Sequence, residues 1–136
     1  MISRIDIAIL IACLGAGAVV AVPRHQMFAR ETRAAEVSAL SFGAATAAQL
    51  AHTRWLAAGQ PATIDGTRGV VAMVNGFPSP ATLPLMLTES ETLAFAYDSG
   101  VWRQRAVGVD QPCGVAYQPP PAPDQNPDIQ ARTSGC

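Results

Sequence analysis

The sequence predicts an α+β fold, in which a long N-terminal α-helix packs on a small antiparallel β-sheet. Three observations support it. Residues 7–23 form an uncharged apolar run, and an amphipathic helical pattern continues from there to about residue 58. Several short strand-like segments with turn residues between them follow. The 136 residues suit one small domain with an appendage, and we expect residues 1–25 to be the apolar half of the helix and residues 26–136 the globular head.

Composition argues against one class of partner. Hydrophobic residues make up 49% of the chain and charged residues only 14%, against roughly 25% in an ordinary soluble domain. The formal net charge is −1, so bulk electrostatics do not favour binding to nucleic acid.

The apolar run admits three interpretations: a secretory signal peptide cleaved near Ala21, a plain membrane anchor, or a helix through which copies of the chain assemble. Asp6 at its start favours the third, because a carboxylate in a membrane costs several kcal/mol and usually marks function. No cluster of basic residues follows Pro23 to stop transfer. Gly15 and Gly17 each weaken a helix by roughly 1 kcal/mol, and Pro23 removes a backbone hydrogen bond, so we expect local unwinding over residues 15–23.

The next segment, residues 24–58, has the spacing of a helix with one apolar face. Its apolar positions recur every three or four residues, and Gly59 followed by Pro61 is a stop signal. We expect the core side of this helix to consist of Val37, Leu40, Ala44, Ala47, Ala48, Ala51 and Trp55.

These N-terminal residues resemble those of type IV pilins and their pseudopilin relatives. Asp6 lies seventeen positions before Pro23, with glycine in the apolar run between them, which is the family's spacing of acid and proline. The segments at residues 33–35, 48–52, 55–59 and 73–78 are similar to pilins of the mannose-sensitive haemagglutinin type. The resemblance covers roughly residues 2–78.

The resemblance implies a structural subunit and not an enzyme. Such subunits are held in the inner membrane, are processed by prepilin peptidase, and are stacked by the pilus assembly machinery into an extracellular helical filament of identical chains. The filament would serve adhesion, motility or DNA uptake. Residues 1–25 would then cross the membrane first and line the filament core afterwards.

The resemblance also assigns roles to three N-terminal residues. Asp6 would meet the N-terminal amine of the neighbouring subunit, and the family places the mature N-terminus at Ile2, whereas this chain begins at Met1. The acid is Asp where the family usually has Glu. Arg4 would either reach the membrane interface or pair with Asp6 of another subunit, since positions two apart on one helix diverge.

The rest of the chain predicts three or four antiparallel strands. We expect a strand at residues 70–74 before an Asn75-Gly76 turn, a short helical turn within residues 80–87, and solvated glutamates at a turn near residues 89–91. Strands are expected at residues 93–97 and 101–107, joined by a turn at residues 98–100, with a last short strand at residues 113–117.

Cysteine placement predicts one cross-link. Cys113 and Cys136 would close a Pro-rich loop with a disulfide worth about 3 kcal/mol on the chain-entropy model, and the loop resembles the disulfide-bounded C-terminal region of pilins. Two free thiols are the alternative. Cys13 is expected to be a small buried hydrophobic residue, with a bridge between subunits as the alternative.

No pattern in the sequence indicates a catalytic site, a metal site or a cofactor. His25 and His52 stand apart, without further ligands at metal spacing, and we expect both on the helix surface. Within the same family, the alternatives to a major pilin are a minor pilin and a pseudopilin of a type II secretion system. From other classes, the alternatives are a secreted soluble domain and a single-pass anchored periplasmic binding module, which would have a continuous helix through residues 15–23.

Overall fold

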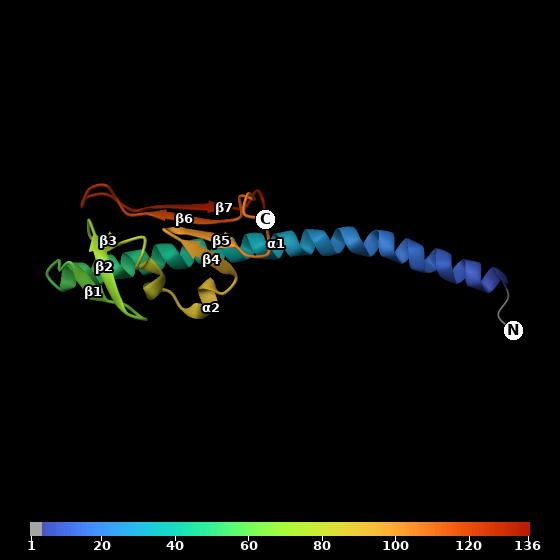
Figure 1. Cartoon of the computed structure of the whole chain (residues 1–136), viewed down its shortest axis with the longest axis horizontal. Coiled ribbons are helices and arrows are strands. Elements are labelled where there is room, and N and C mark those ends of the chain that lie inside the picture. The colour runs from blue at the N-terminus through green and yellow to red at the C-terminus, as the bar shows by residue number, and fades with distance from the viewer. Residues whose placement is uncertain (1–3) are drawn as a thin grey trace. The chain divides into compact units, whose positions relative to one another are not determined.

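The computed structural model describes the backbone of residues 4–136 and the side chains from Arg24 onward. The chain divides into two compact units, Met1–Thr32 and Arg33–Cys136, and each is described by itself. The second unit is α+β, as predicted: the part of helix α1 that it contains packs on antiparallel sheets (Figure 1).

Helix α1 runs from Arg4 to Ala57. It ends where the sequence predicts, because Gly59 and Gln60 adopt left-handed backbone conformations with φ of 82° and 63°. The N–H of Gln60 donates to the carbonyl of Trp55 at 2.9 Å, which closes the last turn. The backbone stays helical through residues 15–23, so the expected unwinding is absent from this single chain. Unwinding of that segment in an assembly of several chains stays a prediction.

The second unit holds two antiparallel sheets. The first has the order β1-β2-β3. Its strands are β1 (Thr63–Asp65), β2 (Val70–Val74) and β3 (Phe77–Pro78). The second has the order β4-β5-β6-β7. Its strands are β4 (Phe95–Asp98), β5 (Val101–Gln104), β6 (Gly114–Gln118) and β7 (Asp128–Arg132). The 3-10 helix η1 (Leu83–Met86) and the short helix α2 (Glu89–Thr92) connect the sheets.

Most of the predicted elements are confirmed, with differences at their ends. Strand β2 and the Asn75-Gly76 turn lie where expected, and the strand expected at residues 113–117 is β6, one residue later. Strand β5 ends at Gln104 and not at residue 107, because the chain turns there: the N–H of Val107 points back to the carbonyl of Gln104. The glutamates near residue 90 belong to α2, which Thr88 and Glu91 begin with a capping box.

Three strands were not expected. β1 and β3 are only three and two residues long, too short to show a periodic pattern. β7 lies within the Pro-rich segment, and four of its five residues are exposed, so it lacks the apolar alternation by which strands are recognised.

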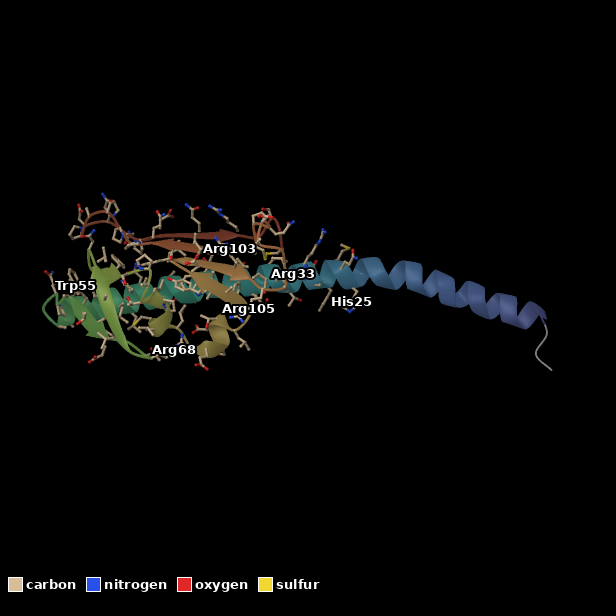
Figure 2. All side chains as sticks on the ribbon, in the orientation of Figure 1. His25, Arg33, Trp55, Arg68, Arg103 and Arg105 are labelled. Carbon is tan, nitrogen blue, oxygen red and sulfur yellow. A yellow bond between two sulfur atoms is a disulfide. The ribbon has the colours of Figure 1, made fainter. Side chains whose placement is uncertain are left out.

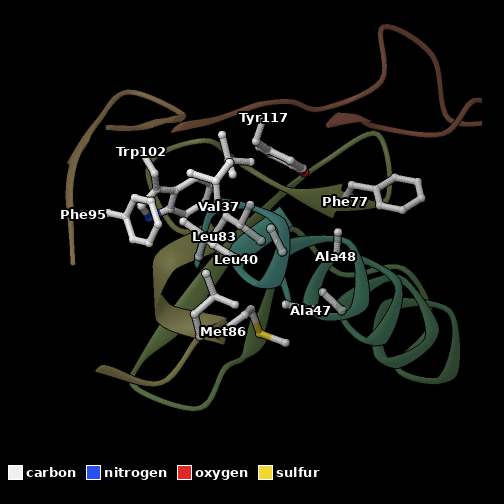
Figure 3. Close-up of a cluster of buried hydrophobic side chains, with 14 of the residues drawn as sticks. Val37, Leu40, Ala47, Ala48, Phe77, Leu83, Met86, Phe95, Trp102 and Tyr117 are labelled. Atoms are coloured by element: carbon white, nitrogen blue, oxygen red, sulfur yellow. The ribbon is translucent and has the colours of Figure 1, made fainter. Parts of the chain in front are cut away.

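The core lies between α1 and the sheets (Figure 3). The predicted helix face is confirmed: six of its seven residues are buried, and Trp55 packs against them half-buried. Four of the six are alanines, whose small side chains let large residues approach the helix closely. The large residues that are fully buried in this core include Phe77, Leu83, Leu87, Trp102 and Tyr117.

The predicted disulfide is present. Cys113 and Cys136 are joined with a Cα–Cα distance of 4.9 Å, and both are buried. The guanidinium Nε of Arg33 donates to the carbonyl oxygen of Cys136 at 2.7 Å. The closed loop is thereby attached to α1, and β7, which lies within it, is held beside β6.

Candidate assembly surface

The N-terminal assembly residues lie at the limit of the described structure. Ile2 lies outside the described residues, and the side chains of Arg4 and Asp6 do too, although their backbone belongs to α1. Gly15, Gly17 and Pro23 are likewise described only as helical backbone. The contacts predicted for Asp6 and Arg4 therefore stay predictions, and so do the burial and partner of Cys13.

In the head, by contrast, the structure describes every side chain on the exposed side of α1. Between Arg33 and Arg54, eight residues of α1 are exposed on the side away from the core, and none carries a charge. We call this set the outer helix face; it consists of Ala35, Ser38, Ala39, Phe42, Thr46, Gln49, Leu50 and Thr53. The solvated face of an amphipathic helix normally carries charged residues, so this composition is unusual for a surface in permanent contact with water.

Two large apolar side chains project from the outer helix face. Phe42 is 76% exposed and Leu50 46% exposed. Burial of a phenylalanine side chain is among the largest hydrophobic contributions that one residue makes to stability. Phe42 gains little of this free energy within its own chain, because most of its side chain stays in contact with water. The exposed apolar residues therefore mark a candidate contact surface.

The hydroxyl groups on this face are occupied within the helix. Ser38, Thr46 and Thr53 each donate to the backbone carbonyl four residues earlier, at 2.9, 2.9 and 3.0 Å. A hydroxyl group bonded in this way needs little from water or from a partner. The face is thus less polar than its residue names indicate, and its burial would leave few donors without partners.

A groove borders the outer helix face. A cavity of about 460 Å³ lies between α1, α2 and β4, with Ala39 and Leu40 on one side and Leu93 and Ala94 on the other. Leu93 is 75% exposed there. Glu36 lies in the same groove, and its carboxylate accepts a hydrogen bond from Nε2 of the buried Gln104. That bond draws the one acidic group of this stretch of α1 toward the sheet and away from the outer helix face.

An aromatic stack fixes the end of α1 against the first sheet. The ring of His52 lies 4.4 Å from that of Phe77 with an interplanar angle of 5°, and 5.6 Å from that of Trp55. Nδ1 of His52 is 2.8 Å from the carbonyl oxygen of Gly76, and Nε1 of Trp55 donates to the carbonyl of Pro61 at 2.9 Å. The expectation that His52 is a simple surface residue is wrong: it is half-buried in this stack. Figure 2 places Trp55 at this end of the head.

Two tyrosines join the second sheet to β3 and to the loop after it. The hydroxyl of Tyr117 donates to the carbonyl of Pro78 at 2.7 Å, and the hydroxyl of Tyr97 donates to that of Pro80. Burial is the main cause that raises the pKa of both phenols above the ordinary value of 10. Both groups are therefore structural donors at neutral pH.

The described residues show neither a metal site nor a membrane-spanning helix. No three His, Cys, Asp or Glu side chains from residue 24 onward lie close enough to hold a metal ion. No helix in the described part of the chain has the length and apolarity that a membrane span requires. The side chains of the apolar run, residues 7–23, fall outside that part, so the predicted transmembrane helix remains untested.

Comparison with known proteins adds no identification. No family model, no curated protein and no solved structure matches this chain.

Proposed function

We propose that this chain is the structural subunit of a type IV pilus-like filament, and that the outer helix face packs against neighbouring subunits. The observation that carries the proposal is the absence of charge from the exposed side of α1 between Arg33 and Arg54, together with the exposure of Phe42. A surface of this kind is stable in water only at a cost, which burial in an assembly would remove.

The proposal combines this face with the N-terminal residues. The outer helix face and the apolar run belong to the same helix α1, so one helix would supply contacts from both halves of the chain. Asp6 would be buried among neighbouring helices, where a carboxylate must find a partner or lose its charge. Pairing with the N-terminal amine of the next subunit, and a contact with Arg4, would set the axial register of the filament.

In this proposal the protein is structural and not catalytic, and its fold is that of a pilin. The unassembled subunit would reside in the inner membrane, and prepilin peptidase and the assembly machinery would act on it there. The assembled form would be extracellular and would serve adhesion, motility or DNA uptake. A minor pilin or a type II secretion pseudopilin would use the same contacts in a shorter or less abundant assembly.

The first experiment is electron cryo-microscopy of material sheared from cells that express the chain, with helical reconstruction. The proposal predicts a thin filament with α1 at its centre, Phe42 buried between subunits and Asp6 beside a neighbouring N-terminus. Absence of the chain from every filament, with all of it in the membrane fraction, would refute the major-pilin form.

Variants of Asp6 separate assembly from simple anchoring. Asp6→Ala should abolish filaments, since it leaves a buried amine without its partner. Asp6→Glu, the matched control, keeps the carboxylate and should assemble. An anchored periplasmic module, for which a helix unbroken through residues 15–23 is also expected, would be insensitive to both changes and would remain monomeric.

A further inference from the structure

The solvent-facing side of the second sheet brings two distant arginines together. Arg103 of β5 is opposite Gly114 of β6, and Gly114 is opposite Arg132 of β7. Residues directly opposite one another in antiparallel strands share a face, so both arginines point to the same side of the sheet. That side is the outer one, because both are exposed while Trp102, next to Arg103, is fully buried.

Gly114 lies between the two arginines in the sheet. It has no side chain, and a Cβ added there would collide with the backbone of Trp102, so only glycine fits. Adjacent strands are about 4.8 Å apart, so the Cα atoms of Arg103 and Arg132 are roughly 10 Å apart, and Gly114 places no side chain between them. A cavity of about 440 Å³ lies over this position, lined by both arginines, Gly114, Val101, Ala116 and Val109. Small-ligand sites have volumes of about 300–1,000 Å³.

The two guanidinium groups are unengaged, in contrast to the other four arginines of the second unit, Arg33–Cys136. Arg33, Arg54, Arg68 and Arg105 each donate to a backbone carbonyl, and Arg68 also lies 3.7 Å from the carboxylate of Glu89. No such bond and no ion pair with a described residue is formed by the side chain of Arg103 or Arg132. Figure 2 shows Arg103 on the sheet and Arg105 nearer to α2. Two free guanidinium groups that flank one cavity are suited to a carboxylate or sulfate group, which arginine binds with two parallel hydrogen bonds.

The surrounding charges limit what kind of anion fits. Asp110 borders the same cavity, and Asp98 and Asp128 lie farther along the outer side of the sheet. A long polyanion such as a nucleic acid would run over these carboxylates and be repelled. A small ligand could place its one anionic group at the arginines, and its hydroxyl groups would find Asp110 and Gln118 as hydrogen-bonding partners.

We propose that Arg103 and Arg132 form a binding site for a small acidic saccharide, with its carboxylate or sulfate group over Gly114. The carbon atoms of the sugar ring would rest on Val101 and Ala116. The site belongs to one chain, so it does not depend on assembly into a filament, and binding by the unassembled chain tests it separately from the proposed function.

The test is titration calorimetry on the detergent-solubilised full chain with galacturonate, and with galactose as the neutral sugar of the same stereochemistry. Galactose 6-sulfate distinguishes a sulfate from a carboxylate, and acetate tests the anion without the sugar. We expect galacturonate or the sulfated sugar to bind and galactose not to bind. Binding of neither acidic sugar would overturn the proposal, and acetate binding as tight as that of galacturonate would overturn its saccharide part.

Variants assign the binding to the two arginines. Arg103→Gln and Arg132→Gln should each raise Kd about tenfold or more, since each removes a charge-assisted pair of hydrogen bonds. Arg54→Gln, the matched control, removes the same charge elsewhere and should leave Kd unchanged. Ala116→Glu places a carboxylate in the cavity and should abolish binding without loss of either arginine.

Circular dichroism of each variant shows that the head still folds. Unchanged affinity in both glutamine variants would overturn the assignment. So would binding of a single-stranded oligonucleotide that depends on Arg103 when no acidic sugar binds.

Discussion

Replacement of Phe42 by alanine should separate folding from assembly. Phenylalanine buries roughly 150–250 Å² when it is fully covered. Because Phe42 is 76% exposed in the subunit, about 150 Å² remains to be buried in a filament. At about 25 cal/mol per Å², this area contributes about 4 kcal/mol per subunit.

Alanine keeps part of that contribution, so we expect Phe42→Ala to weaken subunit addition by roughly 2–3 kcal/mol, or about 30- to 150-fold. Folding should change by less than about 0.5 kcal/mol, because the side chain has few contacts within its own chain. The yield of sheared filaments measures assembly, and urea unfolding of the detergent-solubilised chain measures stability.

Val109→Ala is the matched control for this prediction. Val109 is 81% exposed in the loop between β5 and β6 and does not belong to the outer helix face, so its truncation should leave the filament yield unchanged. A normal yield from Phe42→Ala would refute the reasoning, because the outer helix face would then not be buried in the filament. A large loss of stability in Phe42→Ala would show that the side chain of Phe42 is packed within the subunit and is not exposed.

Three further predictions concern the stability of the head. Serine at both Cys113 and Cys136 should lower the free energy of unfolding by about 3.4 kcal/mol relative to the oxidised parent chain, from the loop of 23 positions, as measured by urea unfolding of both proteins. The free energy of unfolding should fall as pH rises above 10, because a phenol whose pKa is raised by burial loses its proton more readily in the unfolded chain than in the folded one. Tyr117→Phe should make this fall shallower when unfolding is measured as a function of pH. Ala48→Leu should destabilise the head by about 1–3 kcal/mol by overpacking, whereas Ala39→Leu on the outer helix face should not, as thermal unfolding will show.

Each of these has an outcome that contradicts it. A reduced parent as stable as the oxidised chain would mean that the disulfide adds nothing to the closed loop. A pH profile identical in Tyr117→Phe would remove that phenol as the cause of the alkaline loss. Equal effects of leucine at positions 48 and 39 would mean that the two faces of α1 are not distinguished by packing.

Helix α1 in the head and its buried face follow from local information. Spacings of three and four residues place Val37, Leu40 and Ala44 on one side of any helix, whatever packs there. The stop after Ala57 is equally local, since Gly59 adopts a left-handed conformation at little cost. The same reasoning located β2 and the turn after it. The cysteine pair was predicted because a small core gains from a cross-link and because the loop resembles that of pilins, with two free thiols as the alternative.

Features that depend on pairing across the chain were not accessible in this way. β7 is recognised as a strand only because β6 lies beside it, since its own residues show no apolar alternation. His52 looks like a surface residue until the turn at Gly76 brings Phe77 against its ring. The outer helix face is different: its lack of charge can be read from the sequence, and the structure adds that Phe42 and Leu50 on it are exposed.

The sequence by itself predicted α1, the strands β2, β4, β5 and β6 to within a few residues, the buried side of α1 and the cross-link. The helix and these strands depend on backbone preferences and periodicity over a few residues. The tertiary structure decided which groups meet. Arg103 and Arg132 are 29 positions apart, and only the register of β5, β6 and β7 sets them on either side of Gly114. Strand register is set by packing of the whole sheet on the helix, since a slip of one residue would turn every side chain to the opposite face.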